Sequence, residues 1–174
     1  MALTAHSAEF DVRPGEQSLP HDPAARAPDA GLVFIGRVAS PWTRREDCPK
    51  NTMEALGRGK TARLKIDEPY RAGLDGLDGY SHLILLTWLD RAPRDLIKQT
   101  PRHAETARGT FALRSPVRPN PIGLHVVPIV SVNVAEGIIE IAGIDVLDET
   151  PILDIKSYFA STDAIADATR PVKA

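Results

Sequence analysis

Two arginines and an asparagine lie among three prolines in the stretch RSPVRPNPIGLH, residues 114–125. The guanidinium groups of Arg114 and Arg118 are planar, multidentate donors that suit a carboxylate or a phosphate. The amide of Asn120 both donates and accepts, so it suits another amide or the edge of a nucleobase. No Ser-His-Asp spacing accompanies the stretch, and Ser-Pro-Val-Arg is not a nucleophile elbow. These residue types therefore indicate binding and orientation of a polar ligand.

The prolines fix the shape of this stretch before any ligand arrives. Pro116, Pro119 and Pro121 set their own φ angles and push each preceding residue into extended geometry. A loop that is ordered in advance loses less entropy when it binds. The alternative is a rigid structural turn whose arginines cap backbone carbonyls. The density of polar, multidentate side chains favours the binding interpretation.

Carboxylates gather around a turn in IDVLDETPILDIK, residues 144–156, which contains Asp145, Asp148 and Glu149 before Pro151. Such groups accept from ribose hydroxyls and amines, or bind cations. No His or Cys lies nearby in the sequence, so no metal site is expected. The alternative interpretation is an acidic turn with solvated strand ends.

A basic loop with one tryptophan, SPWTRREDCPKN, covers residues 40–51 and contains Arg44 and Arg45. Base stacking combined with phosphate contacts needs this mixture. The alternative is a solvated loop that Trp42 anchors to the core, and both interpretations stay open. Residues 37–65 hold eight basic and three acidic residues, so the near-neutral chain has a basic region.

Short strands must position these residues. β-branched or alternating runs predict strands at 32–40, 62–66, 81–89, 109–113, 123–134, 137–144 and 151–158, with one or two helical turns at 93–99. We expect the nearly continuous apolar run at 81–89 to be buried on both faces, and Pro128 to mark a bulge or an edge. Roughly seven strands with little helix predict a mainly β fold, a barrel or a sandwich.

The chain has 174 residues, 43% of them hydrophobic, which suffices for one domain with a real core. Residues 1–29 are rich in Pro, Ala and charge, so we expect a flexible N-terminal tail before a domain at 30–160 and a C-terminal tail at 161–174. The lone Cys48 excludes an intramolecular disulfide and a multi-cysteine metal site. Without an apolar run of bilayer length or a secretion signal, we expect a cytoplasmic protein with no membrane association.

Four segments together resemble a known family. GRVASPW, GYSHLILLTWL, FALRSPVRPNPIGLHVV and IDVLDETPILDIKSY occur in the order and at the spacing of the TsaA-like family, also called TrmO or YaeB/VirR-like. The resemblance covers about residues 32–158, and its Arg-Pro-Asn-Pro-Ile-Gly core is a specific signal. It implies a single-sheet β-barrel that binds S-adenosylmethionine and works as a homodimer. It also implies methylation of tRNA at N6 of threonylcarbamoyl-adenosine, next to the anticodon.

The resemblance also implies which residues form the site. The cofactor-binding residues would be Pro49, Lys50, Asn51, Asp90, Arg91, Arg114, Leu147, Asp148, Glu149, Thr150 and Pro151. We expect Arg44, Arg45, Arg118 and Asn120 to contact the acceptor, with Asn120 orienting it.

Three short motifs depart from the family pattern. Family members often have Pro-Arg-Gln at 49–51, His-Gln at 90–91 and Asp-Gly-Thr-Pro at 148–151, where this chain has Pro-Lys-Asn, Asp-Arg and Asp-Glu-Thr-Pro. Two alternatives to tRNA methylation therefore stay open. One is an S-adenosylmethionine-binding sensor or scaffold, and the other is a methyltransferase with a small-molecule or protein acceptor.

Overall fold

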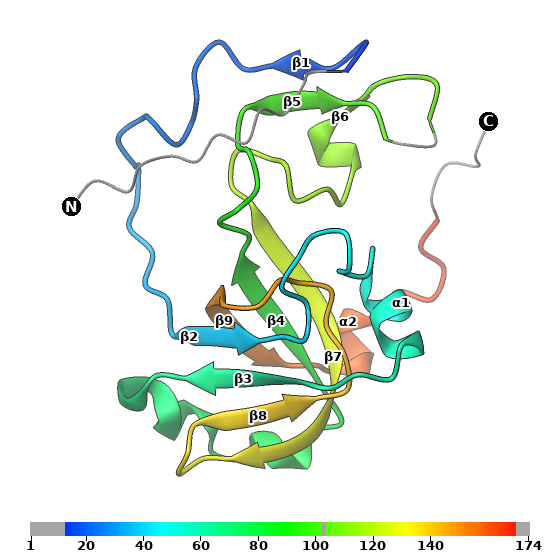
Figure 1. Cartoon of the computed structure of the whole chain (residues 1–174). Coiled ribbons are helices and arrows are strands. Elements are labelled where there is room, and N and C mark those ends of the chain that lie inside the picture. Colours follow the sequence, from blue (N-terminus) through cyan, green and yellow to red (C-terminus); the bar gives the residue numbers. More distant parts are fainter. Residues whose placement is uncertain (1–12, 102–103, 170–174) are drawn as a thin grey trace. The chain divides into compact units, whose positions relative to one another are not determined.

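The computed structural model describes residues 13–101 and 104–169, which form mainly β structure (Figure 1). The chain divides into two compact units. The barrel unit comprises residues 34–86 and the chain from 124 onward. The small-sheet unit comprises the chain up to residue 33 and residues 87–123.

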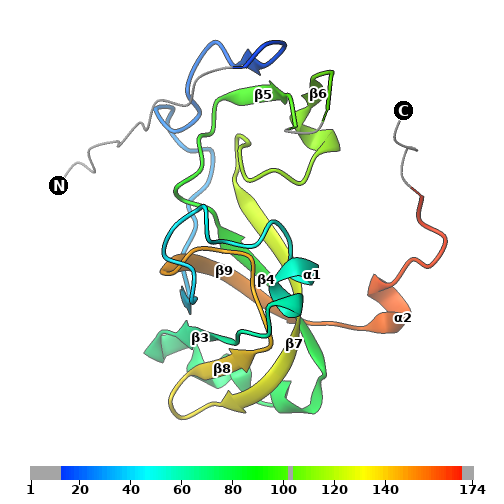
Figure 2. The ribbon, with the colours of Figure 1, turned by 45° about the vertical axis from the view of Figure 1, so that its right-hand side comes forward.

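A closed barrel of six strands confirms the predicted barrel, in the order β2-β3-β8-β7-β4-β9. Its strands are β2 (Gly36–Ala39), β3 (Ala62–Ile66), β4 (His82–Trp88), β7 (Ile122–Asn133), β8 (Ile138–Ile141) and β9 (Thr150–Ser157). Figure 2 shows β3 and β8 side by side, as their antiparallel register requires.

Alternating burial explains why these segments form the barrel wall. On β3, Ala62, Leu64 and Ile66 are buried while the residues between them are exposed. The fully buried side chains come from several strands and include Val38, Leu64, Leu83, Leu85, Ile139, Ile141 and Ile152. The prediction that 81–89 is buried on both faces is wrong. In β4 only alternate residues are buried, because a barrel wall has a single core face.

β7 and β8, which correspond to the strands predicted at 123–134 and 137–144, form an antiparallel hairpin. Gly137 takes a φ of 68° in the turn, a conformation that glycine adopts without a β-carbon penalty. The β7–β8 register shifts between Ile129 and Ser131, directly after Pro128, which confirms the bulge expected there.

Short helices complete the barrel unit. They are α1 (Thr52–Gly57), two 3-10 helices, η1 (Glu68–Leu74) and η2 (Leu77–Gly79), and α2 (Ala160–Asp163). No helix in the described part of the chain is long and apolar enough to cross a membrane.

The small-sheet unit holds three strands in the order β1-β5-β6: β1 (Gln17–Ser18), β5 (Leu96–Gln99) and β6 (Arg108–Gly109). The helical turns predicted at 93–99 and the strand predicted at 109–113 are wrong, since 96–99 is a strand and η3 (Thr110–Ala112) is a 3-10 helix. Pairing with β1 and β6 makes 96–99 a strand, and the buried Gln99 adds further contacts. Its Nε2 donates to Thr110 Oγ1 (2.8 Å) and to the Val117 carbonyl (2.6 Å), partners that lie beyond the local sequence.

Candidate functional site

The strand register places two loops at the same end of the barrel. Val38 pairs with both Leu64 and Thr150, and Ala62 pairs with Ile141. The loop after β2, the start of β3, the end of β8 and the start of β9 therefore lie together. Both predicted cofactor segments of the barrel unit, residues 49–51 and 147–151, belong to this end.

The segment 147–151 is preformed by its own hydrogen bonds. The Leu147 carbonyl accepts from the Thr150 amide (3.3 Å) and hydroxyl (2.7 Å), which closes a tight turn. The Asp148 amide donates to the Trp42 carbonyl (2.7 Å), and the Glu149 amide to the Val38 carbonyl (2.9 Å). Since the amides of 148–150 all donate within the protein, the turn offers a ligand its side chains and remaining carbonyls.

Trp42 anchors the basic loop to the core. Its side chain is 5% exposed, and its Nε1 donates to the Ile144 carbonyl at 2.7 Å. The Arg58 guanidinium and the Lys60 ammonium each lie 5.1 Å from the centre of its ring. The structure thus supports the anchoring interpretation of Trp42 over stacking on an RNA base.

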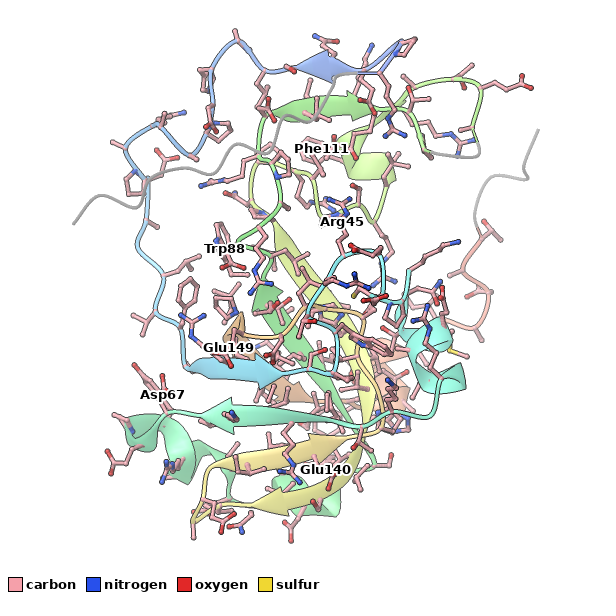
Figure 3. The ribbon with its side chains drawn as sticks, in the orientation of Figure 1. Arg45, Asp67, Trp88, Phe111, Glu140 and Glu149 are labelled. Atoms are coloured by element: carbon pink, nitrogen blue, oxygen red, sulfur yellow. The ribbon has the colours of Figure 1, made fainter. Side chains whose placement is uncertain are left out.

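Arg44 and Arg45 differ in their surroundings. The Arg44 guanidinium is shared between Asp47 (2.8 Å) and Glu46 (3.4 Å) on its own loop. Arg45 is exposed on the same loop (Figure 3). The acidic residues of the loop neutralise the charge of Arg44. The loop therefore presents less net positive charge to a ligand than its two arginines suggest.

Asn51 caps a helix that the sequence analysis did not anticipate. Its Oδ1 accepts from the Glu54 amide (2.9 Å), while the Glu54 carboxylate accepts from the Lys50 amide (3.2 Å). This reciprocal capping begins α1 and fixes residues 49–51, of which Pro49 is buried and the other two are exposed. An Asn-x-x-Glu pattern was the available signal.

His125 and Asp145 form a polar pair beside these segments, and no motif in the sequence signals their contact. His125 Nδ1 donates to Asp145 Oδ1 at 2.9 Å, and Thr52 Oγ1 donates to the same oxygen at 3.2 Å. Burial opposes ionisation of Asp145. The hydrogen bond from His125 and the electrostatic interaction with that residue, together with the Thr52 hydroxyl, nevertheless hold the pKa of this carboxyl below its usual value.

Cys48 is an unreactive thiol at neutral pH. Burial, reinforced by the negative charge of Asp145, raises the pKa of Cys48 to about 11. The thiolate, which is the nucleophilic form, is therefore scarce. Within residues 13–101 and 104–169, no three His, Cys, Asp or Glu side chains are grouped to hold a metal ion.

The remaining predicted residues lie in the small-sheet unit. Asp90, Arg91 and Arg114 are exposed. Arg118 is half-buried, and its NH1 donates to the carbonyls of Leu113 (3.3 Å) and Ser115 (3.4 Å). Arg118 thus caps carbonyls, as the structural-turn interpretation of the proline-rich stretch expects.

Arg94 orients the amide of Asn120 and was missed by the sequence analysis. Its Nε donates to the Pro119 carbonyl (2.6 Å) and its NH2 to Asn120 Oδ1 (3.3 Å). The guanidinium lies 5.3 Å from the centre of the Trp88 ring. Because its oxygen is engaged, Asn120 presents its NH₂ group as a donor.

Each unit therefore gathers its own set of predicted residues. The barrel unit brings together Pro49, Lys50, Asn51, Leu147, Asp148, Glu149, Thr150 and Pro151, with Arg44 and Arg45 on the same loop as residues 49–51. The small-sheet unit holds Asp90, Arg91, Arg114, Arg118 and Asn120.

Comparison with known proteins identifies relatives. The family model of the tRNA-methyltransferase O N-terminal domain matches residues 37–164. The probable S-adenosyl-L-methionine-binding protein VirR of Rhizobium radiobacter is 41% identical over 128 residues, which are 74% of this chain and 70% of VirR. The tRNA (adenine(37)-N6)-methyltransferase of Escherichia coli is 31% identical over 143 residues, 78% of this chain and 60% of that enzyme.

A solved structure shares the fold. The crystal structure of TrmO from Pseudomonas aeruginosa matches with a TM-score of 0.67 and 32% identity, over 82% of this chain and 61% of that one. The chain thus spans about three-fifths of the length of both this protein and the Escherichia coli enzyme.

Glu149 carries backbone strain that a single substitution should relieve. Among the described residues it is the one non-glycine with positive φ, at 62°. Members of the TsaA-like family often have glycine at position 149. We expect Glu149→Gly to raise the free energy of unfolding by about 1 kcal/mol, measured by urea denaturation, because glycine has no β-carbon to clash in this conformation.

Glu149→Ala is the matched control, since it removes the same carboxylate and keeps the β-carbon. It should give no comparable gain. Equal stabilisation by alanine and glycine would show that loss of the charge, rather than relief of strain, is responsible.

Proposed function

Because the chain belongs to the family of tRNA-methyltransferase O N-terminal domains, we propose that it is an S-adenosylmethionine-dependent methyltransferase. Its acceptor in this proposal is the N6 nitrogen of threonylcarbamoyl-adenosine in tRNA. The observation that carries the proposal is the preformed barrel end, where the turn 147–151 and the capped segment 49–51 lie together. These are two of the segments that the family resemblance assigns to the cofactor.

The groups at this end fit the chemistry of the cofactor. S-adenosylmethionine presents a carboxylate, an amine, a sulfonium and an adenosine with ribose hydroxyls. Asp148 Oδ1 accepts from the Ser40 amide at 2.9 Å, and a carboxylate has further lone pairs to accept from hydroxyls or an amine. Lys50 is an exposed cation that suits a carboxylate. In the small-sheet unit, Arg114 offers a guanidinium for the same purpose.

The residues of the chain would act mainly by binding and orientation. When bound, S-adenosylmethionine supplies an activated methyl group for in-line displacement by a nitrogen nucleophile. The amide of Asn120, held by Arg94, is suited to orienting the acceptor. Alignment and exclusion of water then provide most of the acceleration.

The small-sheet unit supports an RNA acceptor. Phe111 on η3 is 76% exposed (Figure 3), and the exposed Arg108 and Arg114 lie three residues to either side of it. Residues 87–123 contain seven basic and three acidic side chains, whereas residues 1–33 contain two basic and five acidic ones, so the basic excess lies in 87–123. Unpaired bases stack on exposed aromatic rings while cations contact the phosphates, so this composition suits single-stranded RNA.

We also propose that the chain works as a homodimer in the cytoplasm, where tRNA is modified. Leu124, Val126 and Val130 on the outer face of β7 are 51%, 37% and 54% exposed, an apolar strip that a second copy would cover. Light scattering during size exclusion measures the mass directly. Twice the 18.9 kDa of one chain supports the dimer, and the mass of one chain contradicts it.

A transfer assay tests the proposed activity. Incubation with methyl-labelled S-adenosylmethionine and total tRNA, followed by digestion to nucleosides, should yield label in the modified adenosine. Binding of the cofactor without methyl transfer to tRNA, protein or small-molecule extracts would instead favour the sensor or scaffold. The departure of Asp90-Arg91 from the family pattern is a reason to test that alternative.

Arg114→Ala provides the cofactor-binding control for this assay. We expect the variant to stay folded, because Arg114 is exposed, and to lose measurable cofactor affinity in calorimetry. Arg26→Ala removes another exposed arginine of the same unit, one paired only at the surface with Asp29, and should bind as the wild type does. Unchanged affinity in folded Arg114→Ala would refute its assigned role.

A further inference from the structure

The carboxylate of Asp145 lies where three segments of the barrel unit meet. It accepts from His125 of β7 at 2.9 Å and from Thr52, the first residue of α1, at 3.2 Å. The side chains of His125 and Asp145 are 7% and 18% exposed. These contacts join residues that are 20 and 93 positions apart in the chain.

The partners of this carboxylate adjoin the two segments assigned to the cofactor. Thr52 directly follows the segment 49–51, and a single residue, Val146, separates Asp145 from the turn 147–151. Gly143 adds a second contact between the same segments, because a β-carbon there would lie 3.2 Å from the Ala55 carbonyl carbon. Helix α1 therefore packs directly on the chain that leads into the turn.

The contacts of Asp145 favour the ionised form of its carboxylate at neutral pH. Burial alone would favour the neutral acid, but the two hydrogen bonds hold the pKa of Asp145 below its usual value. The negative charge of Asp145 also acts on the nearby thiol of Cys48, whose pKa it raises. Glu54 raises the pKa of the same thiol, while Arg45 and Arg58 lower it. Hydrogen bonds to a charged, partly buried group are stronger than hydrogen bonds between neutral groups. The contacts of Asp145 therefore resist separation of residues 49–51 from the turn 147–151.

We propose that Asp145 is a positioning residue of the cofactor site, which holds residues 49–51 and 147–151 in the arrangement that binds S-adenosylmethionine. It acts through Thr52 and His125 and does not itself contact the cofactor. The inference rests on the proposed function, since it assumes that these two segments bind the cofactor. An interaction that fixes a site in advance raises affinity by lowering the entropy lost on binding.

The test compares Asp145→Asn and Thr52→Val with the wild type. Asparagine keeps the shape of the side chain but removes the charge, and valine removes only the hydroxyl that reaches Asp145. We expect Asp145→Asn to raise the Kd and the KM for S-adenosylmethionine roughly tenfold, with a smaller change in kcat. Thr52→Val should weaken binding severalfold, and the two changes should be less than additive because they break one contact.

Asp154→Asn is the matched control, since Asp154 is an acid of the same unit that pairs with Lys156 at the surface. It should leave the Kd unchanged. Thermal unfolding identifies the folded variants. If Asp145→Asn does not fold, Thr52→Val and its rescue by Thr52→Ser decide the question, because serine restores the hydroxyl.

The outcomes separate this inference from the proposed function. A wild-type protein that binds no S-adenosylmethionine overturns both. A wild-type protein that binds and transfers methyl, while folded Asp145→Asn and Thr52→Val bind it equally well, overturns the positioning role alone. Weaker binding by both variants, with normal binding by Thr52→Ser and Asp154→Asn, supports it.

Discussion

The hydrogen-bonded carboxylate of Asp145 is the constraint on which the barrel end depends. A barrel wall fixes its strands through alternating apolar residues, but the chain between strands has no such pattern. In this protein polar contacts hold the chain between the strands in place. Asp145 joins β7, α1 and the segment before β9, and Trp42 ties the loop after β2 to the carbonyl of Ile144. These contacts tie the loops at this end to the barrel wall.

These contacts determine what the end of the barrel can offer to a ligand. The amides of residues 148–150 are satisfied internally, so recognition falls to side chains such as Asp148 and Lys50. Two hydrogen bonds hold the strained backbone of Glu149. The Glu149 amide donates to the Val38 carbonyl, and Arg37 donates to the Glu149 carbonyl at 2.8 Å. Strain of this kind persists only where the surroundings over-determine the conformation, as they do at this turn.

The sequence predicted the barrel but not the contacts that organise its site. Strands such as β3 and β9 were predictable because alternation and flanking turn residues are local signals. Strand β5 was not, since it forms by pairing with β1 and β6, two-residue strands that carry no sequence pattern of their own. The same applies to the site. Proline and arginine in the 114–125 stretch indicated a rigid polar loop, but the capping role of Arg118 and the hold of Arg94 on Asn120 depend on three-dimensional contacts. His125 and Asp145 are 20 residues apart and carry no motif.

A crystal structure of this chain with S-adenosylmethionine would show which residues bind the cofactor. We expect ligand density against Asp148 and Lys50 at the barrel end formed by residues 49–51 and 147–151, with the Asp145 contacts to Thr52 and His125 intact. The barrel unit also has a cavity of about 730 Å³ lined by Tyr70, Tyr80 and Asp154. Cofactor density in that cavity, with residues 49–51 and 147–151 left without contact, would contradict the account.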